Sequence, residues 1–216
     1  MVLPTDSASS RPSPRVDELQ LDALREMTNI GCGNAASALS RLVGGRRVGI
    51  DVPRAIVCDF DAVSAMFGGP ETPVVVVALD VEGKVHGRLL LLMALADAHS
   101  LAGLLLGATA SGPRLSEDER SAICEVANIL ASACLTAIGR ALGMTLLPSV
   151  PRFAEDMAGA VLQEVVASLA ASSDQALVME TRFESKGEKQ FCGHFLVMPD
   201  LPSLPKMLAA LGLGAP

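Results

Sequence analysis

Two short stretches of the sequence place a glutamate three residues before an asparagine: EMTNI, which begins at Glu26, and EVANI, which begins at Glu125. Three residues along a helix turn by about 300°, so Glu26 and Asn29, like Glu125 and Asn128, would project from one helical face. A carboxylate can pair with a lysine of a partner, and an amide can hold a water in line with a phosphorus atom. Phosphoryl transfer depends largely on positioning, so a water-orienting amide is a useful contribution to it.

A solvated helix surface is the alternative interpretation of each pair taken alone. Asparagine is a mediocre helix former, because its amide competes with the backbone for hydrogen bonds. The two stretches have also diverged: when residues 22–44 are aligned with residues 121–143, only seven of 23 positions match. Retention of both residues of the pair in both copies therefore favours a function.

Other catalytic motifs are not evident in the sequence. No Ser or Cys lies in a recognisable nucleophile–base arrangement, and there is no GxxxxGK[ST] loop for a nucleotide. The run GCGN at 31–34 follows a predicted helix rather than a strand, so close helix packing competes with a phosphate-binding role. The three histidines lack zinc-ligand spacing, and we expect no bound metal.

The composition excludes several classes of protein. Half of the 216 residues are hydrophobic, and there are six Phe but no Trp or Tyr, which predicts a globular protein with an aliphatic core. A net charge of −7 and the lack of stacking aromatics argue against nucleic acid as a partner. Five cysteines without a CxxC pair suit reduced thiols that act as small core hydrophobes.

The sequence predicts a cytoplasmic protein without membrane insertion. The N-terminal 15 residues have no apolar signal segment, and their Pro/Ser-rich composition predicts a disordered tail. The longest apolar runs, at 74–79 and 89–96, are far shorter than the roughly 20 residues that a membrane span requires.

The Glu/Asn pairs lie within two copies of a longer pattern, offset by 99 residues at the pairs themselves. Each copy predicts a helix, a strand, a helix, a hairpin and a short apolar helix. The hairpins turn near 82–84 and 186–187. The expected ranges are 74–93 and 176–198 for the hairpins, 100–107 and 203–212 for the closing helices, and 61–67 and 155–170 for the preceding helices.

The join between the copies is a Gly/Pro/Ser-rich linker at 108–119 that ends in a helix-start signal. Ser116 with Glu119 has the spacing of a capping box, and Asp22 and Ser121 occupy equivalent places that suit a helix start. We predict an α/β fold in which a central antiparallel sheet with flanking helices has pseudo-two-fold symmetry. The predicted domain spans 16–216, with halves at about 16–110 and 111–216.

The two helix openings resemble the signature D/S-x3-E-x2-N-x22-P of the CheC family of bacterial and archaeal chemotaxis phosphatases, which is related to CheX and to the flagellar-switch protein FliY. The second copy matches throughout, and the first has its proline one residue late: Ser121, Glu125, Asn128 and Pro151, then Asp22, Glu26, Asn29 and Pro53. The runs NIGCGNAASALSRL (29–42), LPSVPRFAEDMAGAVL (147–162) and GHFLVMPDLPSL (193–204) are also similar to the family. The resemblance covers about residues 17–213.

This resemblance implies a phosphatase that hydrolyses the aspartyl phosphate of CheY-P, a phosphorylated response-regulator receiver. It implies that Glu26 and Glu125 engage the active-site lysine of the receiver, while Asn29 and Asn128 orient the attacking water. The Mg²⁺ ion belongs to the receiver, so the phosphatase needs no cofactor of its own. We expect a monomer, because internal duplication lets one chain supply the symmetry of a dimer.

Two other functions stay open on the same resemblance. CheC-like proteins pair with CheD, a receptor deamidase, here through a helix that begins at Glu155 and ends at Leu169. The apolar residues of this segment are too numerous for one buried stripe, so a partner surface and plain core packing are both open. In the first of these functions the chain is a non-catalytic adaptor that binds CheD or a receiver without hydrolysing the phosphate. Buried asparagines would favour this interpretation. A flagellar-switch component is less expected, since no further domain follows Pro216.

Overall fold

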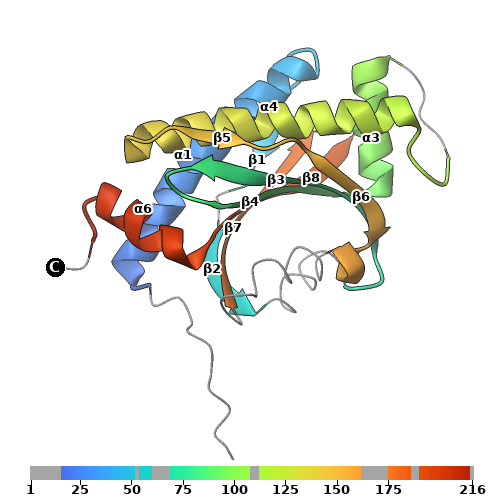
Figure 1. Ribbon diagram of the computed structural model, residues 1–216. Helices are drawn as coiled ribbons and strands as arrows, with labels where there is room; N and C mark the ends of the chain where they lie inside the picture. Colours follow the sequence, from blue (N-terminus) through green and yellow to red (C-terminus); the bar gives the residue numbers. More distant parts are fainter. Residues whose placement is uncertain are drawn as a thin grey trace, which may run out of the picture.

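The computed structural model describes residues 16–51, 54–59, 69–107, 112–161, 175–185 and 190–214 (Figure 1). Within these ranges the chain forms one antiparallel sheet with two long helices along one of its faces. The predicted α/β fold class is therefore confirmed. The N-terminal 15 residues and the predicted helix at 61–67 lie outside the described ranges, and the limits of the two halves stay a prediction.

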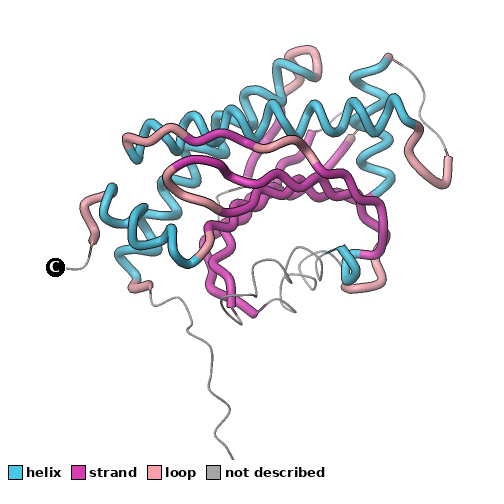
Figure 2. Tube along the Cα trace, in the orientation of Figure 1, coloured by secondary structure: helices cyan, strands magenta, loops and turns pink. Residues whose placement is uncertain are grey.

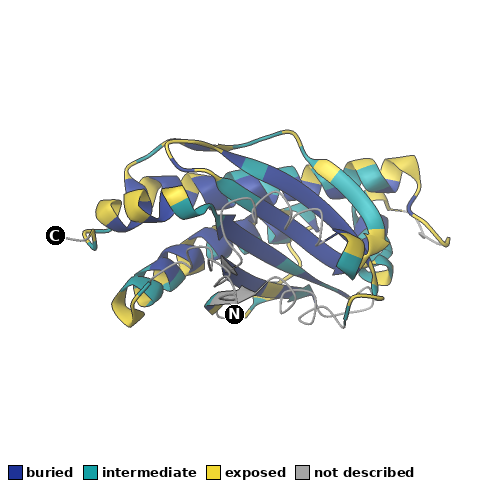
Figure 3. Cartoon of the chain, turned by 60° about the horizontal axis from the view of Figure 1, so that its bottom comes forward, coloured by how far each residue is buried: buried dark blue, intermediate teal, exposed yellow. Residues whose placement is uncertain are grey.

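The two apolar runs form the hairpin at the middle of the sheet, with both faces buried. In the first strand of this hairpin, β3 (Pro73–Gly83), alternate residues such as Val75 and Val77 face the helices, while Val74 and Val76 face a second apolar cluster on the opposite side. Burial of both faces explains why these strands are apolar without alternation. Figure 3 shows the resulting band of buried residues across the sheet.

Eight strands of the described ranges follow the order β1-β7-β8-β4-β3-β5, with β2 also paired to β7 and β6 also paired to β3. Both strand runs predicted for each hairpin are present (Figure 2). The strands are β1 (Val48–Ile50), β2 (Arg54–Asp59), β3 (Pro73–Gly83), β4 (Gly87–Ala94), β5 (Leu146–Pro148), β6 (Arg152–Met157), β7 (Gln175–Ser185) and β8 (Phe191–Pro199).

The two halves exchange strands across the sheet. The strands β1 and β2 of the first half both pair with β7 of the second half, and β5 and β6 of the second half both pair with β3 of the first. The exchange is symmetric about the boundary between β4 and β8, which pair directly. Each half thus completes the sheet of the other.

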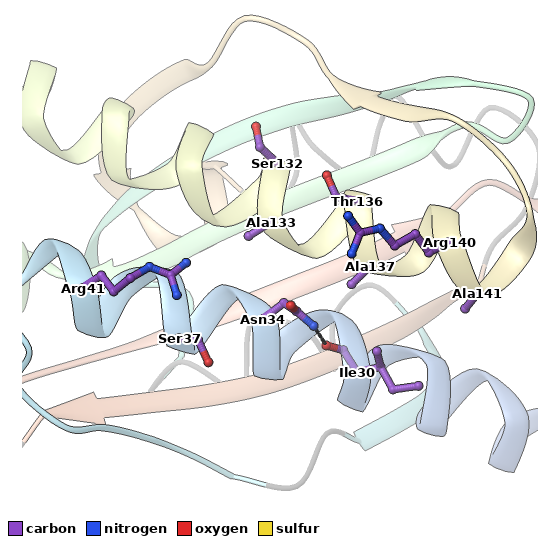
Figure 4. A pocket seen from close by; sticks show the side chains of 10 residues that line it. All are labelled: Ile30, Asn34, Ser37, Arg41, Ser132, Ala133, Thr136, Ala137, Arg140 and Ala141. Carbon is purple, nitrogen blue, oxygen red and sulfur yellow. Dashed lines mark hydrogen bonds between the residues drawn. The ribbon is translucent and has the colours of Figure 1, made fainter.

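The helices gather mainly on one face of this sheet. The two longest run in opposite directions and pack against each other, as Figures 1 and 4 show. The shorter helices flank them. The helices are α1 (Glu18–Leu42), α3 (Leu95–Leu106), α4 (Glu117–Leu142), the 3₁₀ turn η1 (Leu201–Ser203) and α6 (Leu204–Ala210).

Equivalent capping boxes start the two long helices. The Ser116 side chain accepts from the backbone of Glu119, which reaches back to Ser116, so the predicted capping box is confirmed. Asp17 and Gln20 form the same box at the start of α1. Asp22 and Ser121 each lie four residues after the first residue of their helix, so they are near a helix start as predicted, but neither is the N-cap.

The predicted helix at 155–169 begins three residues later than expected. Glu155 belongs to β6, where it pairs with Val75, and a helix begins only at Ala158. Residues 162–169 lie outside the described ranges. The ladder with β3 satisfies the backbone hydrogen bonds of 152–157, which overrides the helical pattern of the local sequence. The proposed CheD-binding helix is thus wrong at its start.

The closing helices also differ from their predicted limits. The helix α3 begins five residues before the predicted position, because Ala94 at the end of β4 already serves as its N-cap in an extended conformation. The predicted second helix is divided into the turn η1 and the helix α6, with Pro202 and Pro205 near their N-terminal ends.

The cysteines follow the prediction in part. Cys32 and Cys134 are buried at the contact between the long helices, whereas Cys124 and Cys192 are half-buried. Cys58 belongs to the strand β2, but its side chain is not among those that the structure describes.

By length and composition alone, α4 meets the test for a membrane-spanning helix. Its most apolar stretch is 56% buried inside the protein, as expected for a core helix packed on a sheet. This is weak evidence for a membrane span, and the cytoplasmic location stays a prediction.

Candidate active site

The first Glu/Asn pair stands on the outward face of α1. Between Glu26 and Asn29 the chain buries Met27 and Thr28, so the helical turn divides these four residues into an outward and an inward pair. The Thr28 hydroxyl donates to the Leu24 carbonyl at 2.7 Å and lies 2.8 Å from the Met179 sulfur of β7. These inward contacts fix the rotation of α1 that exposes Glu26 and Asn29.

The second pair has the same geometry on α4. Val126 and Ala127 are buried between Glu125, which is exposed, and Asn128, which is half-exposed. None of the four side chains forms a hydrogen bond or ion pair with any part of the chain that the structure describes. The carboxylates and amides of both pairs are therefore available to a partner.

The contact between the helices explains the glycine run after the first pair. A Cβ atom on Gly31 would lie 2.9 Å from the Cys134 sulfur and 3.0 Å from Cγ1 of Ile138, whereas one on Gly33 would meet nothing within 4 Å. Gly31 therefore permits close approach of α4. The close-packing interpretation of GCGN is confirmed for Gly31, and the run is not a phosphate loop, because it lies in the interior of α1.

A groove of about 700 Å³ runs between α1 and α4 on the surface of the helix layer (Figure 4). It contains one arginine from each long helix, Arg41 and Arg140. The sequence repeat aligns these two residues, but it did not indicate that they share a groove. The lining residues are Ile30, Asn34, Ser37, Arg41, Ser132, Ala133, Thr136, Ala137, Arg140 and Ala141.

A histidine anchors the N-terminal turn of α4, less than two turns before the second pair. The His99 ring contacts Glu119 through Nδ1 at 2.9 Å and the Gly112 carbonyl through Nε2 at 3.2 Å. Burial raises the pKa of the Glu119 carboxyl, but donation from the Ser116 backbone N–H and the His99 ring outweighs it and lowers this pKa overall. The anchored cap fixes the position of α4.

A second polar cluster lies in the sheet itself. Glu180 is 2% exposed and contacts Nδ1 of His194 at 2.8 Å and Nε of Arg54 at 3.5 Å. The His194 contact is the main cause that lowers the pKa of Glu180. In the described ranges no group of three or more His, Cys, Asp or Glu residues is arranged to hold a metal ion.

Comparisons with known proteins agree with the duplicated helices. A family model described as the CheC-like family matches residues 19–57 and 119–155, which are the two long helices and the strands that follow them. The sequence is 35% identical to CheY-P phosphatase CheC of Bacillus subtilis over 201 residues, which covers 91% of this chain and 96% of that protein.

More distant similarity extends to flagellar proteins. The flagellar motor switch phosphatase FliY of Bacillus subtilis is 31% identical over 68% of this chain, but this covers only 40% of that protein. The crystal structure of Thermotoga maritima FliY superposes with a TM-score of 0.71 and 22% identity, over 91% of this chain and 98% of that one. At this identity the structural likeness supports the fold alone.

Proposed function

Because this chain belongs to the CheC-like family, we propose that it hydrolyses the aspartyl phosphate of a phosphorylated CheY-type receiver at two sites, Glu26/Asn29 and Glu125/Asn128. The observation that carries the proposal is that both pairs stand outward at the same register of two long helices, with no partner among the described residues. A pair that caps its own helix or packs in the core would not serve a partner in this way.

The proposed role of each asparagine is to position water. The Asn29 or Asn128 side chain enters the receiver site and holds a water in line with the bond between phosphorus and the aspartyl oxygen. Attack by this water breaks that bond and yields a free aspartate carboxylate and inorganic phosphate, with the water protons passing to phosphate and solvent. The receiver's own Mg²⁺ neutralises charge on the phosphoryl oxygens.

The proposed role of each glutamate is to hold the receiver in register. An exposed carboxylate is an acceptor for the receiver's active-site lysine, and a charge-assisted hydrogen bond of this kind is stronger than a neutral one. Because the glutamate lies three residues before the asparagine, this contact places the amide at the adjacent phosphoryl group.

The test is release of inorganic phosphate from a Mg²⁺-loaded, phosphorylated CheY-type receiver. We expect Asn29→Ala with Asn128→Ala to slow the accelerated hydrolysis by about 10²-fold, since the attacking water loses its orientation. A Gln190→Ala variant removes an exposed amide outside both helices and controls for the loss of a surface amide. Circular dichroism establishes that each variant is folded.

Full acceleration in the double variant would contradict the asparagine mechanism. A wild-type chain that binds the receiver without accelerating hydrolysis would instead support the non-catalytic adaptor. No observation in the described ranges favours that alternative.

A further inference from the structure

The groove between α1 and α4 concentrates positive charge in an acidic protein. Arg41 and Arg140 are equivalent in the sequence repeat, both are exposed, and neither forms an ion pair with a described residue. Figure 4 shows their side chains pointing into the groove from its two ends. The chain as a whole carries a net charge of −7, so this pair of guanidinium groups stands out from its surroundings.

Helical spacing connects each arginine with a Glu/Asn pair. On α1 the lining residues Ile30, Asn34, Ser37 and Arg41 follow steps of four, three and four, which keeps them on one stripe. One turn earlier on the same stripe lies Glu26. The equivalent stripe on α4 begins at Glu125 and ends at Arg140.

The opposite directions of the helices bring unlike ends of the two stripes together. The contact of Gly31 with Cys134 and Ile138 sets the register, in which the start of the α1 stripe faces the end of the α4 stripe. Glu26 therefore lies at the same end of the groove as Arg140. Glu125 lies at the other end with Arg41.

The two arginines are the strongest donors in this groove. The Asn34 amide already donates to the Ile30 carbonyl at 2.8 Å, and the Ser37 hydroxyl to the Gly33 carbonyl at 2.9 Å. A guanidinium group presents its donors in a planar fork that fits a carboxylate, and a cleft strengthens its field. The groove is thus suited to an acidic protein surface.

We propose that each arginine completes the site on the opposite helix by binding carboxylates around the phosphorylation site of the receiver. Arg140 serves Glu26/Asn29, and Arg41 serves Glu125/Asn128. The inference rests on the proposed function, because a receiver that holds Mg²⁺ beside an aspartyl phosphate needs carboxylates there. A glutamate for the receiver's lysine and an arginine for its carboxylates make each end of the groove complementary to that site. The arginines act in docking, not in the chemical step.

Direct binding tests the docking role independently of hydrolysis. The probe is a CheY-type receiver loaded with Mg²⁺ and beryllofluoride, titrated at low and high ionic strength. We expect Arg41→Gln with Arg140→Gln to raise Kd about tenfold at low salt and to flatten the dependence of Kd on salt. Arg114→Gln removes an exposed arginine from the loop before α4 and is the matched control.

Kinetics in single-site backgrounds test the cross-helix assignment. With Asn128→Ala silencing one site, Arg140→Gln is expected to raise KM about fivefold at unchanged kcat, and Arg41→Gln to raise it clearly less. The opposite ranking would overturn the assignment. Arg140→Lys is expected to keep part of the affinity that Arg140→Gln loses, since lysine retains the charge without the planar fork of donors.

The outcomes separate this inference from the proposed function. If the double arginine variant has an unchanged Kd and an unchanged salt dependence, the docking role is wrong. The phosphatase mechanism is tested separately by the hydrolysis rate of the double asparagine variant. If that asparagine variant hydrolyses normally, the mechanism fails and the Kd values still decide the role of the arginines. A wild-type chain that does not bind the receiver overturns both.

Discussion

The helix of the second half is set deeper in the protein than the helix of the first. The helix α4 packs against α1, α3 and strands β3 to β6, whereas α1 contacts α4 and the strands β1, β2 and β7. Asn128 is accordingly half-exposed, whereas Asn29 is exposed. Two helices with unequal surroundings nevertheless present the same Glu/Asn pair at the same register.

The difference between the helices shows which of their positions are free to change. At the inward positions the copies have diverged: Thr28 corresponds to Ala127, and Gly31 corresponds to Leu130. Each inward residue is fitted to its own neighbours. The outward pair forms no hydrogen bond or ion pair within the described chain, which agrees with the proposal that a partner accounts for its retention in both copies.

Replacing a residue of one half with the equivalent residue of the other half should change stability most at the contact between α1 and α4. Gly31→Leu gives α1 the residue that α4 carries at this place, and it should lower the free energy of unfolding by about 3 kcal/mol, because the side chain collides with Cys134 and Ile138. Denaturant unfolding measures this change. Gly33→Ala, where a Cβ meets open space, should stabilise the protein by about 0.5–1 kcal/mol. A neutral Gly31→Leu variant would show that the helices adjust freely.

A smaller effect should distinguish the two capping boxes in acid. The third position of the box is Glu119 in α4 but the neutral Gln20 in α1. The pKa of Glu119 is lowered in the folded state, so its stabilising contribution is complete above about pH 4.5 and is lost as the pH falls through the folded value.

Exchanging the two capping residues tests this distinction. Between pH 5 and pH 3 the free energy of unfolding of the wild type falls in part because Glu119 is protonated. In the Glu119→Gln variant this fall should be smaller by about 1 kcal/mol. Gln20→Glu should add acid dependence at the start of α1. Denaturant unfolding at several pH values measures both changes. Equal acid sensitivity of the wild type and the Glu119→Gln variant would contradict the role of this carboxylate.

The smallest expected effect compares the two sites directly. If the pairs act independently and equally, Asn29→Ala and Asn128→Ala each remove one site and each lower the rate of phosphate release about twofold, as a sum of two rates requires. Phosphate release at saturating receiver measures both variants. Loss of nearly all activity in one single variant would show that the unequal burial of the helices makes the sites unequal.

The parts of the fold that follow from local pattern are predictable from the sequence. The runs of Val at 74–77 and Leu at 89–92 identify the central hairpin, and Ser116 with Glu119 identifies the start of α4. The spacing of the Glu/Asn pairs places them on one outward face, as the structure has them. The capping box of Asp17 and Gln20 was also readable, since it stands 99 residues before its counterpart.

The remainder depends on contacts between distant parts of the chain. Residues 152–157 are a strand because β3 lies beside them, and the local sequence around Glu155 carries no sign of that partner. The shared end of the groove for Glu26 and Arg140 follows from the opposite directions of two helices about a hundred residues apart. Local periodicity specifies the face of each helix but not the register between them.

The exchanged strands also determine when the chain can fold during synthesis. The strands β1 and β2 leave the ribosome early, but their partner β7 ends only at Ser185. Until then β1 and β2 lack their partner, and β4 must wait longer still for β8, which ends at Pro199. Pairing over such sequence separations is slow, because a long loop must close before the contacts form. We therefore expect the duplicated halves to fold together after most of the chain has emerged, and the unpaired apolar strands of a nascent first half to be prone to aggregation until then.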